Sequence, residues 1–186
     1  LKKTILPEFL STNSSNETID LRIWSAGCST GEEPYSILIS LMEYFGKNYS
    51  DIICGVLATD ISQKSLDNAI RGQYANVKAG SKIKQYLAPY IRNVGDETFE
   101  IKKSVRKEVT FRKFNLTKGI YPFKDRFHLI FCRNVFFYFS DECRHRAQSK
   151  IADSLDQGGY LFLGDAEKFD FKIYGLSRIG NGIYRK

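Results

Sequence analysis

Two adjacent glutamates, Glu32 and Glu33, stand in a glycine-containing stretch near the start of the chain, RIWSAGCSTGEEPYS at 22–36. Gly27 and Gly31 would allow a ligand to approach the backbone closely, as glycines do in nucleotide-binding turns. A phosphate at this place would need basic side chains or free backbone N–H groups, and two carboxylates would repel it. The stretch therefore predicts a ligand with a cationic end, unless the acids only stabilise the start of a helix.

A third acid suggests what the rest of that ligand is. Asp60 ends the apolar segment IICGVLATD at 52–60. At the end of a strand in a nucleotide-binding fold, a carboxylate can accept hydrogen bonds from both hydroxyls of a ribose. An adenosine with a cationic tail suits both places, because Asp60 can bind its ribose and Glu32 its cationic group. S-adenosylmethionine is such a molecule, because it carries an ammonium and a sulfonium group.

The elements that must position these residues alternate along the chain. Apolar segments predict strands at 21–26, 52–60, 108–116, 126–132 and 158–165, and helical spacing predicts helices at 29–46, 61–74 and about 141–155. This alternation indicates parallel β-α-β units and a doubly wound, mostly parallel α/β sheet. A closing pair of segments around 180–182 predicts an antiparallel edge hairpin.

In such a sheet a ligand binds beyond the carboxyl ends of the strands. Polar or small residues follow each predicted strand, and we expect them to meet there: Ala26, Gly27, Gly31 and Glu32; Asp60; Asn115; Arg133, Asn134 and Tyr138; Asp165 and Glu167. Ser29 and Thr30 could cap the first predicted helix, Ser62 the second, and Gly46 could end the first.

Composition and length exclude several classes of protein. The 186 residues are 42% hydrophobic and suit one domain, 1–186, with one sizeable core. The chain has no apolar run of about 18 residues and begins without the pattern of a signal peptide, so we expect a cytoplasmic protein with no membrane insertion. The four cysteines form no CxxC pair and are expected to be free thiols. With only two histidines we expect no metal site.

The net charge of +7 is concentrated in one part of the chain. Residues 71–118 contain 12 Lys and Arg against 4 Asp and Glu, and the rest is nearly neutral. Such a run is usually a solvated face; it could also attract an acidic protein or, less readily, nucleic acid. We expect no nucleic-acid partner, because no aromatic-rich RNA-binding motif accompanies the charge.

Several segments carry a resemblance to a known family. WSAGCSTGEEPYS, ATDIS, FNL, FCRNVFFYF and GGYLFLGDAE, in this order, closely resemble the motifs of the chemotaxis receptor methyltransferases. These enzymes are S-adenosylmethionine-dependent protein-glutamate O-methyltransferases of bacterial chemoreceptors. The resemblance spans nearly the whole chain. It implies a Rossmann-like methyltransferase sheet, S-adenosylmethionine as cofactor, and the cytoplasmic domain of a chemoreceptor as partner.

The resemblance also implies roles for the residues after the first two strands. Ala26, Gly27 and Gly31 would line the methionine part of the cofactor. Glu32 would bind its amino group, and Asp60 its ribose. Each residue also has a structural explanation, because glycines can serve a tight turn and an acid can stabilise a helix start.

For the later strands, the resemblance implies the adenine site and the reaction site. Asn115 and Leu116 would bind the adenine. Arg133 and Asn134 would shape the same wall of the pocket, and Tyr138, the tyrosine of CRNVxxYF, would face the methyl group. Arg133 and Tyr138 are thus the candidate catalytic residues, although Tyr138 could be a core residue and Asn134 a helix cap.

The family pattern and this sequence differ in two places. The family carries a helical region with an NxTxFFR-type stretch ahead of its catalytic domain; no such stretch occurs in these 186 residues, so we expect a catalytic domain without that region. The segment GDAE stands where the family usually has GHSE, which gives Asp165 in place of a histidine. The family also has a small receptor-docking β-subdomain, which corresponds to the basic segment 75–107.

Three functions remain open from the sequence. The first is methyl transfer to glutamate side chains, which needs no general base because the carboxylate is already ionised at neutral pH. The second is a truncated or degenerate module that binds the cofactor or a receptor without turnover. The third is a nucleic-acid methyltransferase. We expect the first, in a monomer.

Overall fold

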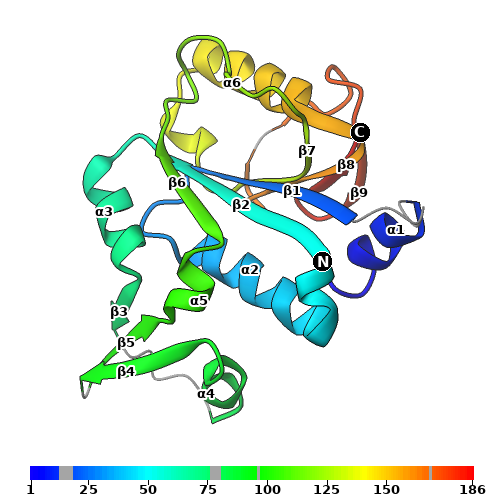
Figure 1. Cartoon of the computed structure of the whole chain (residues 1–186). Helices are drawn as coiled ribbons and strands as arrows, with labels where there is room; N and C mark the ends of the chain where they lie inside the picture. The colour runs from blue at the N-terminus through cyan, green and yellow to red at the C-terminus, as the bar shows by residue number, and fades with distance from the viewer. Residues whose placement is uncertain (13–18, 76–80, 96, 168) are drawn as a thin grey trace.

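The computed structural model describes residues 1–12, 19–75, 81–95, 97–167 and 169–186. Its main element is a seven-stranded sheet (Figure 1). In spatial order the strands are β6 (Val109–Lys113), β2 (Ile52–Asp60), β1 (Ile19–Ala26), β7 (Phe127–Cys132), β8 (Leu155–Leu163), β10 (Ile183–Arg185) and β9 (Ser177–Gly180). The first five are parallel, and β10 runs antiparallel to both of its neighbours. The predicted doubly wound sheet with an antiparallel edge hairpin is confirmed.

Helices cover both faces of this sheet (Figure 1). The helices are α1 (Ile5–Thr12), α2 (Glu32–Phe45), α3 (Gln63–Arg71) and α6 (Asp141–Ser154), with short 3-10 turns η1 (Gly46–Asp51) and η2 (Phe136–Tyr138). In the figure α1 and α2 lie on the opposite side of the sheet from α6. Within the described part of the chain, every helix falls short of the length and hydrophobicity that a membrane span requires.

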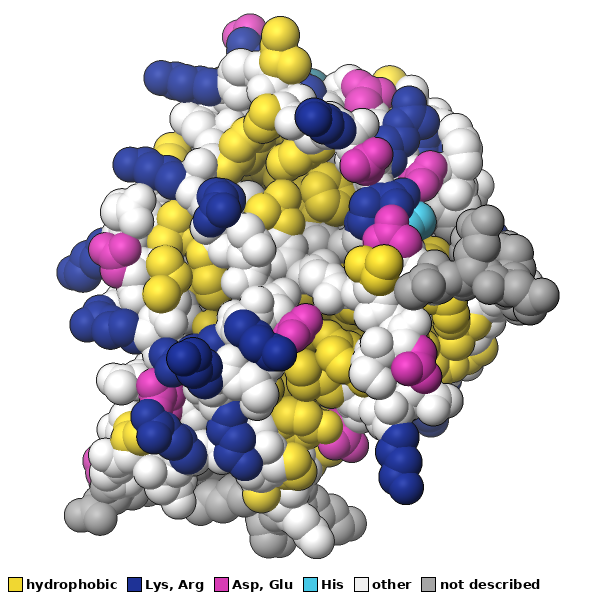
Figure 2. Space-filling view, in the orientation of Figure 1, with side chains coloured by type: hydrophobic (Ala, Val, Ile, Leu, Met, Phe, Trp, Pro, Cys, Tyr) yellow, Lys and Arg dark blue, Asp and Glu magenta, His cyan; other side chains and the backbone are white. Residues whose placement is uncertain are grey.

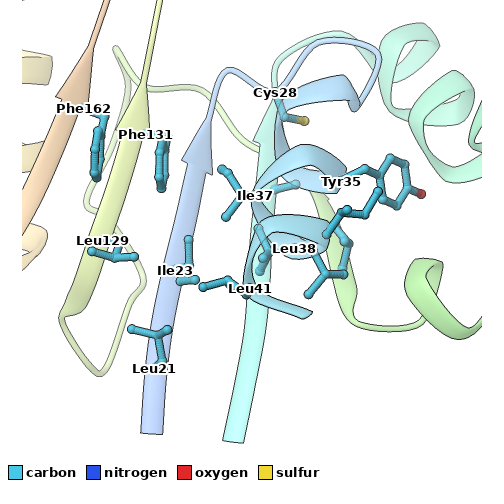
Figure 3. Packing of buried hydrophobic residues seen from close by; sticks show 14 of the residues in the cluster. Leu21, Ile23, Cys28, Tyr35, Ile37, Leu38, Leu41, Leu129, Phe131 and Phe162 are labelled. Carbon is cyan, nitrogen blue, oxygen red and sulfur yellow. The ribbon is translucent and has the colours of Figure 1, made fainter. Parts of the chain in front are cut away.

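The strands supply two separate cores because successive side chains point to opposite faces. In β1, Ile23 packs toward α2, whereas the neighbouring Trp24 packs on the α6 side. Figure 3 shows the first of these cores: Ile23 of β1 lies beside Leu41 of α2, and Phe131 of β7 stands beside Phe162 of β8. Both faces of the central strands are thus apolar, as is usual for parallel strands.

A second, three-stranded sheet lies between α3 and β6 along the chain. Its order is β3 (Gln73–Ala75), β5 (Thr98–Ile101), β4 (Ile91–Gly95), and it is accompanied by α4 (Ser81–Leu87) and α5 (Lys103–Arg106). Figure 1 shows it projecting from the α2 and α3 side of the main sheet. It falls largely within the segment 75–107 that we expected to form an insertion; residues 76–80 and 96 of that segment lie outside the described residues.

Some predicted boundaries were wrong. Helix α2 starts at Glu32, not at 29. Its N-cap residue is Gly31, with a φ of 95°, and the helix start has no side-chain cap. Ser29 and Thr30 therefore do not cap this helix. Ser62 does cap α3, by accepting from the Ser65 amide, but that helix ends at Arg71 because Gly72 turns left-handed. Gly46 ends α2 as expected.

The chain also leaves two strands at other points than expected. The strand predicted at 108–116 spans Val109–Lys113, so 114–116 leave the sheet at the carboxyl ends of the strands. The last long strand, predicted at 158–165, spans Leu155–Leu163. All four cysteines are free thiols, as expected.

Candidate active site at the carboxyl ends of the strands

A pocket of about 420 Å³ opens where the strand order reverses, between β1 and β7. This volume lies in the range of small-molecule sites, and the topological switch point is where α/β sheets bind ligands. The lining residues all lie at or just after the carboxyl ends of β1, β2, β6 and β7: Gly27, Ser29, Asp60, Ile61, Phe114, Asn115, Leu116, Arg133, Asn134, Val135, Tyr138 and Phe139. Seven of the residues predicted to bind the cofactor or to act in catalysis are among them.

The turn after β1 is bonded to the end of β2. The amides of Gly27 and Cys28 both donate to the carbonyl oxygen of Thr59, at 2.8 and 2.9 Å. Gly27 has a φ of 81°, and a Cβ on it would lie 2.5 Å from Cγ2 of Val135. Only glycine suits this position, since it combines left-handed backbone with close approach of the opposite pocket wall.

Asp60 holds the same turn through its side chain. Its Oδ2 accepts from the amide of Ser29 at 2.8 Å, and its Oδ1 accepts from the amide of Ser62 at 2.9 Å. An ionised carboxylate has about four acceptor positions, so two remain for donors from a ligand. Asp60 can therefore fix the turn and accept from a pair of hydroxyls at once.

The residues after β6 form the neighbouring wall. The Phe114 amide donates to the Asp60 carbonyl at 2.9 Å, which turns the chain toward the pocket. The side-chain oxygen of Asn115 accepts from both the amide and the hydroxyl of Thr117, each at 2.9 Å. The Asn115 NH₂ group is thus the part of that side chain that can donate to a ligand. Leu116 is buried beneath it, at 6% exposure.

An acid that we did not predict lies behind Arg133. Glu33 accepts from the hydroxyl of Ser25 at 2.8 Å through Oε1, and its Oε2 lies 3.7 Å from Nη1 of Arg133. Burial raises the pKa of Glu33 above its ordinary value of 4.5, against the opposing effects of the Ser25 hydroxyl and the Arg133 charge. The Arg133 side chain is half-exposed, so its guanidinium has one side on Glu33 and another open to solvent.

The rest of the loop after β7 forms the mouth of the pocket. Tyr138 is 85% exposed there, which leaves its hydroxyl accessible from outside. Asn134 has a left-handed backbone with a φ of 59°. Val135 and Phe139 add apolar surface to the lining. The mouth therefore combines polar groups with apolar surface.

Three predicted cofactor residues do not line this pocket. Ala26 is fully buried at the end of β1. Gly31 is packed against α3, where an added Cβ would lie 2.8 Å from Cβ of Ala69. Glu32 is exposed, accepts from the hydroxyl of Thr30, and borders a neighbouring groove. Their roles toward a cofactor stay predictions.

Other lining residues were missed from the sequence: Ser29, Ile61, Phe114, Val135 and Phe139. Each stands one to two residues from a predicted site residue. The predicted strand ends could therefore have identified them. The sequence offers no such signal for Glu32 against Glu33. Successive residues of a helix point about 100° apart, and the sequence does not fix which of the two acids faces inward. Asp165 is exposed and does not line the pocket.

Comparison with known proteins identifies the family. Residues 1–178 match the family model described as CheR methyltransferase, SAM binding domain. The chain belongs to this family. A chemotaxis protein methyltransferase of Borreliella burgdorferi is 38% identical over 167 residues, 90% of this chain and 59% of that protein. One of Listeria innocua is 37% identical over 187 residues, all of this chain and 67% of that protein.

A solved structure agrees with the fold. The DszA carbon methyltransferase is 18% identical, with a TM-score of 0.50 over 85% of this chain and 32% of that one. The matched family model describes a SAM-binding domain, so S-adenosylmethionine is the cofactor. The pocket fits it: the lining combines apolar surface for an adenine with free acceptor positions on Asp60 for a ribose. Among the described residues, no group of three or more His, Cys, Asp or Glu could hold a metal ion.

The raised pKa of Glu33 predicts a pH dependence of stability. Because the folded-state pKa lies above the unfolded value, protonation favours the folded state, and this contribution is lost as pH rises from about 4.5 through the folded pKa. Urea unfolding of the wild type and of Glu33→Gln across this range should therefore show the wild type losing stability relative to the variant as pH increases. If the unfolding free energy of the wild type minus that of the variant stayed constant or increased with pH, the raised pKa of Glu33 would be contradicted.

Proposed function

We propose that this domain transfers the methyl group of S-adenosylmethionine to glutamate side chains in the cytoplasmic part of a bacterial chemoreceptor, forming methyl esters. The main support is the pocket at the switch point, in which residues from four strand ends meet. The relatives named chemotaxis protein methyltransferases support the same substrate class. The chain spans 59% and 67% of the length of the two relatives described above. That this chain shares the activity of those longer proteins is therefore part of the proposal.

The chemistry asks little of the protein beyond positioning. S-adenosylmethionine supplies a methyl group that its sulfonium activates. The receiving carboxylate is ionised at neutral pH, so the chain needs no general base. Holding a nucleophile in line can contribute about 7–11 kcal/mol. The half-exposed guanidinium of Arg133 is placed to orient an incoming carboxylate, and the exposed hydroxyl of Tyr138 is available on the same side.

Within the pocket, we assign the cofactor's parts to the residues that the family resemblance implies. Asp60 binds the ribose hydroxyls, and Asn115 with Leu116 contacts the adenine. The turn at 26–31 carries the methionine part, and Glu32 binds its ammonium group. In this conformation the Glu32 side chain is hydrogen-bonded to Thr30, so this last role requires a different rotamer.

Two related ligands separate the ribose contact from the ammonium contact. S-adenosylhomocysteine carries both groups, whereas methylthioadenosine has the ribose and lacks the ammonium. In titration calorimetry, Asp60→Asn should weaken both ligands by about tenfold or more, since a charge-assisted bond contributes about 1.5–3 kcal/mol. Glu32→Gln should weaken S-adenosylhomocysteine only. If Glu32→Gln weakened both ligands equally, this acid would act only through the stability of the helix. If a folded Asp60→Asn variant bound both ligands as tightly as the wild type, Asp60 would not bind the ribose.

Methyl transfer itself can be measured with labelled S-adenosylmethionine and a receptor cytoplasmic fragment. We expect label in the fragment that mild alkali releases as methanol, because methyl esters hydrolyse under those conditions and N-methyl groups do not. A fragment with its acceptor glutamates changed to alanine is the control. Cofactor binding without transfer would favour a module without turnover, and alkali-stable label in an added RNA would favour the nucleic-acid alternative.

We further propose that the second sheet and α5 dock this domain onto an acidic receptor surface. Figure 2 shows Lys and Arg side chains along the side of the molecule that carries α3, β6 and α5 in Figure 1. Lys103 and Lys107 of this region are exposed. By contrast, the Lys102 ammonium donates to the Pro89 carbonyl at 2.8 Å, and Arg106 donates to the Arg71 carbonyl at 2.9 Å. Lys103 and Lys107 are therefore the side chains of this group that are exposed enough to meet a partner, although Lys107 also lies 3.5 Å from Oε1 of Glu108.

Reversing Lys103 and Lys107 tests the docking surface and keeps the bonds of Lys102 and Arg106, although it removes the exposed ion pair of Lys107 with Glu108. Lys103→Glu/Lys107→Glu should slow association with a receptor fragment and flatten its salt dependence, because rim charges act mainly on the on-rate. S-adenosylhomocysteine affinity should stay unchanged. The matched control, Lys47→Glu/Lys124→Glu, makes the same charge change at exposed positions elsewhere. Equal slowing by both variants would indicate a net-charge effect and contradict a local docking site.

A further inference from the structure

A buried glutamate next to the cofactor pocket has no role in the chemistry described so far. Glu167 follows β8 and is 8% exposed. It does not line the pocket. A carboxylate is rarely buried to this degree unless hydrogen bonds or a cation compensate for the lost hydration. Its partners therefore indicate what it does.

Four backbone amides donate to this one carboxylate. Oε1 accepts from Val135 at 2.7 Å and from Phe136 at 2.8 Å. Oε2 accepts from Asn134 at 3.0 Å and from Gly164 at 2.8 Å. Hydrogen bonds to an ionised acceptor are about twice as strong as those between neutral groups. The loop after β7 is thus bound to the loop after β8 through a single side chain.

The three amides at 134–136 belong to the loop that forms one wall of the pocket. Asn134 and Val135 line it directly, and Arg133 precedes them. The same loop leads into η2, whose last residue is Tyr138. Asn134 adopts a left-handed backbone, which is uncommon outside glycine although asparagine tolerates it better than most residues. The bonds to Glu167 hold the loop in this conformation.

The arrangement is specific for a glutamate at this position. An ionised carboxylate is a pure acceptor, so both of its oxygens can face amides; the NH₂ group of a glutamine would face two of those donors instead. The site is also closely packed, because a Cβ on Gly164 would lie 3.1 Å from both Oε2 of Glu167 and Nδ2 of Asn134. A shorter side chain could not reach all four amides without moving one of the two loops.

We propose that Glu167 is a positioning residue for the cofactor pocket, acting through the backbone of 134–136 to place Arg133 and Tyr138. Its carboxylate accepts from the four amides and does not line the pocket. The proposal rests on the proposed function, in that the loop it holds is taken as the wall of the S-adenosylmethionine site. Its removal should weaken ligand binding by displacing that wall, even in a protein that stays folded.

The test compares two buried carboxylates. Glu100 is 5% exposed and pairs with Arg106 in the second sheet, with 3.2 Å between Oε1 and Nη2, away from the pocket. Glu167→Gln and Glu100→Gln should both lower thermal stability. Only Glu167→Gln should raise the dissociation constant of S-adenosylhomocysteine, by at least tenfold, and Glu167→Asp should fall between it and the wild type. Equal dissociation constants for the wild type and Glu167→Gln, or equal losses in both Gln variants, would overturn the proposal.

Amide hydrogen exchange gives a readout that needs no ligand, and its wild-type part needs no variant. In the wild type, the amides at 134–136 should exchange slowly, and in Glu167→Gln they should lose this protection while the central strands keep theirs. Fast exchange of these amides in the wild type would overturn the proposal even if the variants failed to fold. If the wild type did not bind S-adenosylhomocysteine, the proposed function would be wrong, and the exchange measurement would still decide whether Glu167 holds the loop.

Discussion

The site depends on the way the chain leaves β1. Three residues of the turn, at 27, 29 and 31, have positive φ angles of 81°, 48° and 95°, so the chain reverses within a few residues and enters α2. Two amides of this turn bond to the Thr59 carbonyl and a third bonds to the Asp60 side chain. The ends of β1 and β2 are therefore locked together. The start of α2, the position of Asp60 and one side of the pocket all follow from this lock.

Carboxylates rather than basic groups organise the pocket. Asp60 and Glu167 are each held by backbone amides, whereas Glu33 combines a serine hydroxyl with the nearby charge of Arg133. Backbone N–H groups that would otherwise be free to bind a phosphate are thus already occupied by acids. This arrangement suits a ligand with a positively charged tail and disfavours a pyrophosphate, for the same electrostatic reason.

The second sheet is tied to the turn as well as to α3. The hydroxyl of Tyr74 in β3 donates to the Thr30 carbonyl at 2.8 Å. Glu100 in β5 pairs with Arg106 of α5, which itself donates to the last residue of α3. These contacts attach the second sheet and α5 to the elements that build the pocket.

The sequence by itself determined the order of the five parallel strands and of α2, α3 and α6, because apolar runs and helical spacing persist whatever the neighbours are. It also marked the strand ends where Asp60, Asn115 and Arg133 lie together. It also determined the family through motifs spread along the chain. Only the tertiary structure decided which of Glu32 and Glu33 faces Arg133, that α2 starts without a side-chain cap, and that Glu167 gathers amides from a loop some thirty positions earlier. These outcomes depend on rotation about a helix axis, on left-handed backbone at single residues, and on hydrogen bonds between distant loops, none of which leaves a period or a composition in the sequence.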